Sequence, residues 1–111
     1  MTLRRARTAD EYVEWVKQAV FETQELHACL EYDLEDPQRL PKYLEQLENS
    51  INSLFESMKT GNYQFGRHPL PFMDLVQRFG EEIPFGTLLK QINETHQHGL
   101  DIETDAEEMD L

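Results

Sequence analysis

The sequence predicts an all-α protein, and three observations support this prediction. Apolar residues recur every three or four positions in four separate stretches, which is the spacing of one buried helix face. Glycine or proline stands at the boundaries of these stretches. No stretch alternates apolar and polar residues with the period of two that marks a strand. We expect two long helices packed as an antiparallel hairpin and two short C-terminal helices, together forming one bundle-like domain over residues 1–100.

The composition limits the class of protein. The chain has 111 residues, which supports one domain with a core of its own, and a net charge of −12. A single cysteine, Cys29, excludes a small disulfide-stapled scaffold. The negative charge disfavours direct binding to nucleic acid or to an anionic membrane. No segment reaches the roughly 18 consecutive apolar residues of a membrane span. We therefore expect a cytoplasmic protein.

The first long helix is expected over residues 9–33. Thr8 and Glu11 match a capping box, in which Thr8 accepts from the third helical amide and Glu11 reaches back to the cap amide. The apolar residues that follow form two adjacent rows, a wider arc than one neighbouring helix covers. Two short helices have to cover Tyr12, Trp15 and Ala19 in addition to the seam of the second helix. This leaves open a homodimer through the first helix, beside a monomer with complete internal coverage.

The other three helices follow from apolar spacing and from helix-breaking residues. Pro37 ends the first helix, and the second begins near Asp36 or Pro41 and ends before Gly61. Its apolar seam repeats at steps of four and three residues and comprises Leu40, Leu44, Leu47, Ile51, Leu54 and Met58. A short helix is expected over residues 71–79. A last helix opens at Pro84 and stops at Gly99.

The two ends of the chain carry opposite charge. Residues 1–8 hold three arginines and no acid, whereas residues 101–111 hold six acidic residues and no base. The mutual repulsion of these acids and the few apolar residues among them predict a disordered, solubilising tail over 101–111. Binding of a basic partner surface by this tail is the alternative.

A search for catalytic or metal-binding patterns is mostly negative. None of the four histidines follows a Glu at the i,i+3 spacing of a bundle metal site. His96 and His98 would point about 200° apart on a helix and converge only if its end frays. His27 lies on the apolar seam of the first helix, where a buried imidazole needs a hydrogen-bond partner, and Cys29 reads as a small buried residue. We expect no catalytic residue, no bound metal and no cofactor.

The aperiodic stretch over residues 61–72 is the best candidate for a binding surface. Aromatic residues and arginine are enriched in interface cores, and binding residues concentrate on loops. The candidate partner-binding residues are Tyr63, Phe65, Arg67, His68 and Phe72. The alternative is that the rings of this loop fold back to plug the open end of the helical hairpin. We expect a small acidic accessory or regulatory factor that binds another protein.

Two other functions remain open on the sequence. Acidic residues form ladders on the outer faces of both long helices, with carboxylates about 5–6 Å apart, a spacing comparable to that of phosphates along a nucleic-acid strand. The ladder residues are Glu11, Glu14, Glu22, Glu25, Glu45, Glu48 and Glu56. A DNA-mimicking inhibitor of a nucleic-acid-binding protein is therefore the first alternative. A metal-dependent enzyme that uses His96 and His98 is the second.

Overall fold

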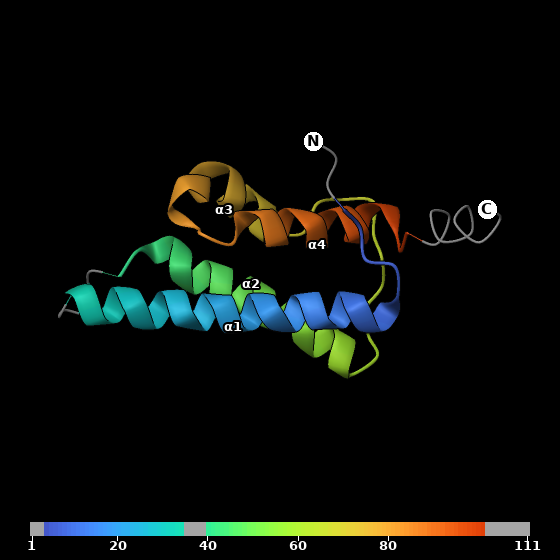
Figure 1. Ribbon diagram of the computed structural model, residues 1–111, viewed down its shortest axis with the longest axis horizontal. Helices are drawn as coiled ribbons and strands as arrows, with labels where there is room; N and C mark the ends of the chain where they lie inside the picture. Colours follow the sequence, from blue (N-terminus) through green and yellow to red (C-terminus); the bar gives the residue numbers. More distant parts are fainter. Residues whose placement is uncertain (1–3, 35–39, 102–111) are drawn as a thin grey trace.

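The computed structural model describes residues 4–34 and 40–101, and all regular structure within these ranges is helical (Figure 1). The elements are α1 (Ala9–Leu34), α2 (Lys42–Lys59), α3 (Phe72–Phe79), a short 3₁₀ turn η2 (Gly80–Glu82) and α4 (Gly86–His98). The all-helical prediction is confirmed, with helix boundaries close to those expected. From residue 102 onward, the predicted acidic tail lies outside the described residues, as do residues 35–39 after α1.

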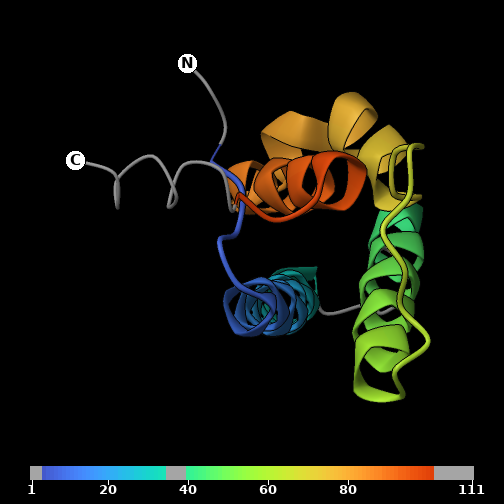
Figure 2. The same ribbon diagram turned by 90° about the vertical axis from the view of Figure 1, so that its right-hand side faces the viewer.

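The helix α1 forms the base on which α2 and α4 pack. In Figure 1, α4 lies above α1 and runs in the opposite direction, while α2 slopes across behind α1. The view along α1 in Figure 2 shows α4 on one side of it and α2 on another. The short α3 bridges α2 and α4. Because α2 crosses α1 obliquely and their connection lies outside the described residues, the predicted hairpin is not established.

A capping arrangement fixes the start of α1, with one difference from the expectation. The Glu11 N–H donates to Thr8 Oγ1 at 3.0 Å, as predicted. The Glu11 carboxylate accepts from the N–H of Arg7, at 3.0 Å, rather than from that of Thr8. It also forms an ion pair of 2.7 Å with Arg4, whose guanidinium lies 5.1 Å from the centre of the Trp15 ring. The helix start is thus tied to the N-terminal segment.

The core follows the predicted apolar seams. In α2, the seam residues Leu44, Leu47, Ile51 and Leu54 are buried, and Tyr43 stacks on Phe79 with ring centres 4.7 Å apart. The buried residues of α1 are Tyr12, Val16, Ala19 and Thr23. Those of α3 and α4 include Phe72, Leu75, Val76, Leu89 and Ile92. One contiguous core therefore joins all four helices.

Of the two alternatives left open for the first helix, the burial of Tyr12 and Ala19 fits coverage within the chain. Tyr12 is 2% exposed and Ala19 is fully buried, while Trp15 is half-buried. The rings of Tyr63 and Phe65, from the connection between α2 and α3, lie against Tyr12, and the Ile92 carbonyl of α4 lies 3.3 Å from its hydroxyl. Both α2 and α4 pack along α1. The large apolar side chains that α1 leaves exposed are Phe21 and Tyr32.

Of the two predictions for single residues of α1, the one for His27 is confirmed and the one for Cys29 is wrong. His27 is half-buried and finds the partner that its place on the seam requires, since its Nδ1 hydrogen-bonds the Glu48 carboxylate of α2. Its Nε2 lies 3.2 Å from Glu31. Cys29 is exposed, so its assignment as a small buried residue is wrong. Position 29 lies on the solvent side of α1, because two residues turn a helix by about 200° from the seam position of His27.

Candidate partner-binding site

The structure separates the five residues predicted to bind a partner. Arg67 and His68 are exposed, Phe65 is 49% exposed, and Tyr63 is half-buried. Phe72 is 1% exposed and belongs to the core, where the first turn of α3 buries it. We correct its assignment accordingly, because a residue this buried is not available to a partner. The remaining four lie on one connection between α2 and α3.

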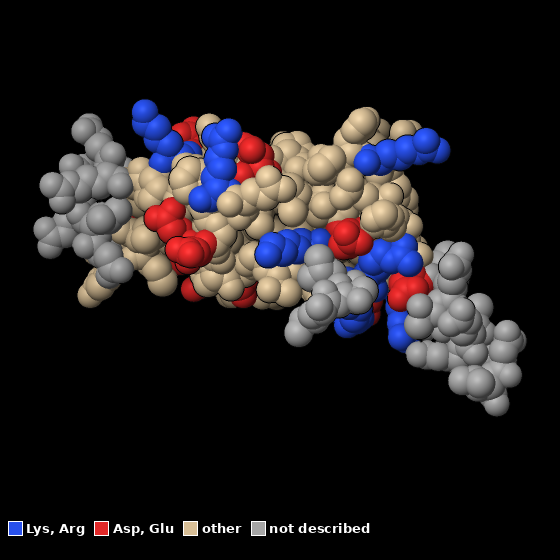
Figure 3. Space-filling model, turned by 90° about the horizontal axis from the view of Figure 1, so that it is seen from above, with Lys and Arg blue, Asp and Glu red and all other residues tan. Residues whose placement is uncertain are grey.

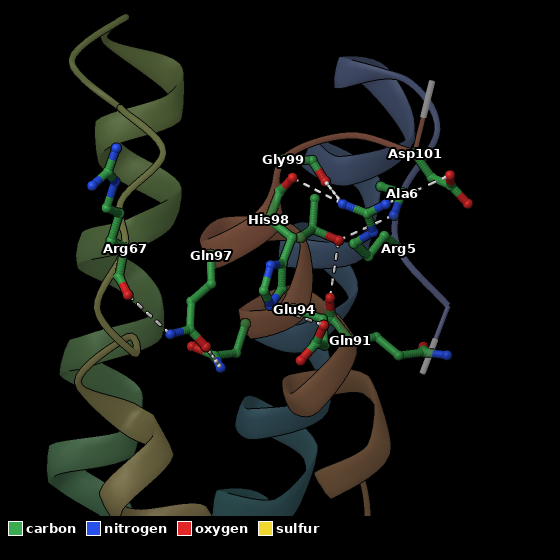
Figure 4. Close-up of polar contacts among 11 residues, drawn as sticks. Arg5, Ala6, Arg67, Gln91, Glu94, Gln97, His98, Gly99 and Asp101 are labelled. Atoms are coloured by element: carbon green, nitrogen blue, oxygen red, sulfur yellow. Dashed lines mark hydrogen bonds and ion pairs between the residues drawn. The ribbon is translucent and has the colours of Figure 1, made fainter. Parts of the chain in front are cut away.

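Three hydrogen bonds fasten the backbone of this connection along α4. The N–H of Gly66 donates to the His96 carbonyl at 3.2 Å, and the N–H of Leu70 donates to Asn93 Oδ1 at 2.8 Å. Between them, Gln97 Nε2 donates to the Arg67 carbonyl at 3.1 Å. Figure 4 shows the Arg67 carbonyl facing Gln97 while the Arg67 guanidinium extends away from it. The backbone of the loop is thus held while its charged side chain stays free to face solvent.

Asn93 and Gln97 form one polar unit on α4. They stand four residues apart, which places them on the same helix face, and Asn93 Nδ2 donates to Gln97 Oε1 at 2.9 Å. Asn93 is 7% exposed, so its amide needs these partners. The loop backbone forms no helix or strand, so these two side chains supply hydrogen-bond partners that it would otherwise lack.

Three side chains from distant parts of the chain form a hydrogen-bonded chain beside the loop. The Tyr63 hydroxyl lies 2.7 Å from His96 Nδ1 and 2.8 Å from the Tyr12 hydroxyl. The Tyr12 hydroxyl also lies 3.3 Å from the Ile92 carbonyl, to which it can donate. Burial raises the pKa of Tyr63 to about 12 and raises that of Tyr12 as well, so both phenols are neutral near pH 7. Burial lowers the pKa of His96.

The exposed ring of Phe65 rests on this cluster. It stacks on the Tyr12 ring with centres 5.8 Å apart and planes 10° apart, and it meets the Tyr63 ring edge-on at 5.3 Å. Both arrangements are favourable for aromatic pairs. Phe65 is therefore held in one position although half of it faces solvent.

An apolar groove opens beside these rings, between the start of α1, the end of α2 and the loop. Its volume is about 220 Å³, and almost all of its lining is apolar. The lining residues are Ala9, Tyr12, Val13, Met58, Gly61, Tyr63, Phe65 and Leu100. Small-molecule sites usually measure about 300–1,000 Å³ and contain several convergent polar groups. This groove is smaller and lacks the polar groups, so its size and chemistry suit an apolar side chain.

The N-terminal segment fixes the end of α4 on the opposite side from the loop. Arg5 Nη1 donates to the His98 carbonyl at 2.8 Å, which satisfies an unpaired carbonyl and places positive charge at the negative helix end. The Ala6 N–H donates to Thr95 Oγ1 at 3.0 Å, and the Asp101 N–H donates to the Ala6 carbonyl at 2.8 Å. Figure 4 shows Arg5 between Asp101 and the last turn of α4.

A larger cavity of about 660 Å³ lies at the corner between α3, η2 and α4. Its lining includes Arg78, Glu81, Glu82 and Lys90, so both signs of charge are present. Arg78 already forms an ion pair of 3.4 Å with Asp74. Because side chains of both charges line this cavity, it shows no preference for an anionic or a cationic ligand.

The carboxylate ladders do not form an uninterrupted acidic surface. Glu11 pairs with Arg4, Glu48 with His27, and Glu56 with Lys59, while Glu22 accepts a hydrogen bond from Gln18. On the face shown in Figure 3, acidic and basic side chains are interspersed. Four of the seven ladder carboxylates thus have a cationic or hydrogen-bonding partner.

His96 and His98 make separate contacts. His96 binds Tyr63, whereas His98 is exposed and lies 3.5 Å from Glu94 one turn earlier in α4. Within residues 4–34 and 40–101, no three His, Cys, Asp or Glu side chains are grouped so that they could hold a metal ion.

Tyr12, Asn93 and His96 also belong to this site, although no sequence pattern indicated them. The apolar spacing left Tyr12 open between internal burial and a surface for a second copy, and 84 residues separate it from His96 in sequence. No local pattern brings them together. Asn93 and Gln97 could have been noticed in the sequence. Two amide side chains at i,i+4 lie on one helix face, and such a pair can bind the backbone of a loop that packs there.

Comparisons with models of protein families, with curated proteins and with solved structures found no match to this chain. The helices of the described residues are all too short or too polar to cross a membrane.

Proposed function

We propose that the protein is a cytoplasmic accessory or regulatory factor that binds another protein and performs no catalytic step of its own. The proposed binding site is the apolar groove together with the exposed parts of Phe65, Arg67 and His68. The observation that carries the proposal is Phe65, a half-exposed aromatic ring held in place by stacking on buried Tyr12.

A fixed aromatic ring beside an apolar groove favours binding for two reasons. An exposed ring and groove both lose unfavourable contact with water when a partner covers them. The stacking and the hydrogen bonds to α4 already order the loop, so docking costs little additional conformational entropy. Arg67 and His68 are exposed on the same loop and supply polar contacts at the rim of such an interface.

The alternatives have weaker support. An inhibitor that mimics DNA needs a continuous array of free carboxylates, and four of the seven ladder carboxylates have partners. A metal-dependent enzyme would need His96 and His98 to converge, and their contacts lie with different neighbours. A homodimer through α1 would have to use Phe21 and Tyr32, since Tyr12 and Ala19 are buried.

The experiment compares two phenylalanines of similar exposure. Phe65 is 49% exposed beside the groove, and Phe21 is 53% exposed on α1 outside it. Wild type, Phe65→Ala and Phe21→Ala are each immobilised and used to capture proteins from a lysate of the native host, with quantitative mass spectrometry as readout. We expect Phe65→Ala to capture at least about tenfold less of a protein that wild type captures, which is equivalent to about 1.4 kcal/mol of binding free energy. We expect Phe21→Ala to capture as much of that protein as wild type does.

Circular dichroism of the three proteins establishes that each has kept its helices. Equal capture by wild type and a folded Phe65→Ala would overturn the proposal. Capture that is unaffected by Phe65→Ala but falls steeply as salt is raised would instead favour the acidic-inhibitor alternative.

A further inference from the structure

The side chain and the backbone of His96 both hold the loop, the first at Tyr63 and the second at Gly66. Its Nδ1 accepts or donates a hydrogen bond with the Tyr63 hydroxyl, and its carbonyl accepts from the Gly66 N–H. Its Nε2 packs so closely on Gly66 that a Cβ atom there would lie only 2.9 Å away. The Tyr63 side chain and the Gly66 backbone are thus both fastened to α4 at one titratable residue, whereas the N–H groups of Asn62 and Tyr63 bind the Ser57 carbonyl of α2.

We propose that proton uptake by His96 releases the Tyr63 side chain and residues 64–66 from α4, so that the apolar groove loses one wall and binds its partner more weakly at mildly acidic pH. The binding consequence rests on the proposed function, whereas the release itself does not. Tyr63 and Phe65 form that wall, and both rings belong to the released part.

Protonation reverses the order of donors in the hydrogen-bonded chain. With a neutral ring protonated on Nε2, Tyr63 donates to His96 Nδ1 and Tyr12 donates to Tyr63. When both ring nitrogens carry protons, Nδ1 must donate to Tyr63, Tyr63 to Tyr12, and Tyr12 to the Ile92 carbonyl. That last contact is the longest in the chain, at 3.3 Å. The reversal thus keeps both contacts of the chain and adds a weak third bond, so the cost of protonation comes from the added charge rather than from a lost hydrogen bond.

The charge that protonation adds faces neutral groups. From the loop the ring meets Tyr63, and from α1 the chain continues to Tyr12; both are phenols that stay protonated at acidic and neutral pH. On α4 itself, Glu94 pairs with His98 at 3.5 Å, and the Arg5 guanidinium of the N-terminal segment binds the His98 carbonyl. The ring is half-buried, and its hydrogen bond runs to a phenol rather than to a carboxylate. A buried charge without a counter-charge is unfavourable.

The rest of the loop is held independently of this ring. The Leu70 N–H bonds the Asn93 side chain, which does not titrate, and Leu70 and Phe72 are 7% and 1% exposed. Release is therefore confined to the Tyr63 side chain and residues 64–66, while residue 70 and the start of α3 stay in place, as do the N–H groups of Asn62 and Tyr63 on Ser57. Leu70 thus provides an internal reference for any measurement on Gly66.

The test is amide hydrogen exchange of the full-length protein, followed by NMR between about pH 7.5 and about pH 5, a range that spans the ordinary histidine pKa. Exchange rates are expressed as protection factors, which removes the intrinsic pH dependence of exchange. We expect the protection of Gly66 to fall by about threefold or more relative to that of Leu70 as the pH is lowered. Unchanged relative protection in the wild type would overturn the proposal.

Two variants assign the effect to one ring. His96→Gln retains an acceptor for the Tyr63 hydroxyl but never becomes charged, so its relative protection should not change with pH. His98→Gln removes the exposed histidine of the same helix end and should behave as the wild type. Persistence of the full pH effect in His96→Gln would overturn the assignment. If His96→Gln does not fold, the NMR titration of the His96 ring in the wild type replaces it, and its midpoint must coincide with that of Gly66 release.

Failure of the proposed function gives a different result. Release of Gly66 at acidic pH, together with equal capture of a partner at both pH values, would reject the groove as the binding site and leave the release standing. Loss of capture at acidic pH without release of Gly66 would reject the His96 mechanism.

Discussion

Asn93 Oδ1 accepts a hydrogen bond of 2.8 Å from the Leu70 N–H, and both groups are buried. Helix α4 thereby supplies, from a side chain, the acceptor that the backbone of an aperiodic loop lacks. The loop and the helix are 23 positions apart in the sequence, so this bond ties the connection before α3 to the last helix.

Replacing Asn93 should therefore cost stability. In Asn93→Ala the Leu70 N–H stays buried without its acceptor, and we expect the free energy of unfolding to fall by about 1–3 kcal/mol. Urea denaturation followed by circular dichroism measures the change. The control is Asn52→Ala, on the exposed face of α2, for which we expect a change within about 0.5 kcal/mol. Equal effects of the two substitutions would contradict this role for Asn93.

Gly66 is required by a close approach rather than by its backbone dihedral angle. A Cβ atom at this position would lie 2.9 Å from His96 Nε2, and the Tyr63 hydroxyl holds that ring in place. We expect Gly66→Ala to lower the free energy of unfolding by about 1–3 kcal/mol, because the ring or the loop must shift. Urea denaturation again measures this change. The NMR resonances of the His96 ring show whether the ring has moved.

Gly86 offers the matched control for that substitution. Nothing lies within 4 Å of a Cβ atom built at Gly86, which is the first residue of α4. We expect Gly86→Ala to be neutral or to stabilise the protein by up to about 1 kcal/mol, because alanine loses less backbone entropy in a helix. Destabilisation by both alanines would show that contact with His96 is not the cause.

Glu11 should make the stability of the protein depend on acidic pH. The hydrogen bond from the Arg7 N–H, followed by the contacts with Arg4, holds the pKa of this carboxyl below its ordinary value of about 4.3. The folded protein then binds this proton less tightly than the unfolded chain. Its contribution to stability is complete above the ordinary pKa and is lost as the pH falls through the lowered one.

The measurement is the free energy of unfolding of wild type and Glu11→Gln between about pH 7 and about pH 3, the range that spans carboxyl titration. We expect the advantage of the wild type to shrink on acidification within that range. Arg4→Gln should retain most of the effect, because the backbone bond from Arg7 is the larger cause. A difference between wild type and Glu11→Gln that stays constant with pH would contradict the prediction.

Local features of the sequence were sufficient to predict the helices. Apolar spacing identified the buried seam of α2, and proline and glycine marked helix ends, because both act within one or two turns of the chain. The same reasoning failed for Cys29, whose small size suggested burial although its helix phase turns it toward solvent. It also failed for Phe72, whose position beside an aperiodic loop concealed its place in the core.

The candidate site could be predicted only in part. Composition singled out the loop that carries Phe65 and Arg67, since aromatic residues and arginine are typical of interfaces. It could not show that Phe65 stacks on Tyr12 or that Tyr63 binds His96, because those pairs are 53 and 33 residues apart. Such contacts depend on how whole helices cross.

By itself, the sequence determined the helical class, the four apolar faces and the loop between the second and third helices. The tertiary structure decided that the loop and α4 together cover Tyr12, and that the loop lies along α4 with one ring half-exposed. The physical reason is the range of the forces involved. Helix formation reflects hydrogen bonds and apolar spacing over a few residues, whereas the choice of neighbours reflects packing of complete faces, which no short stretch of sequence specifies.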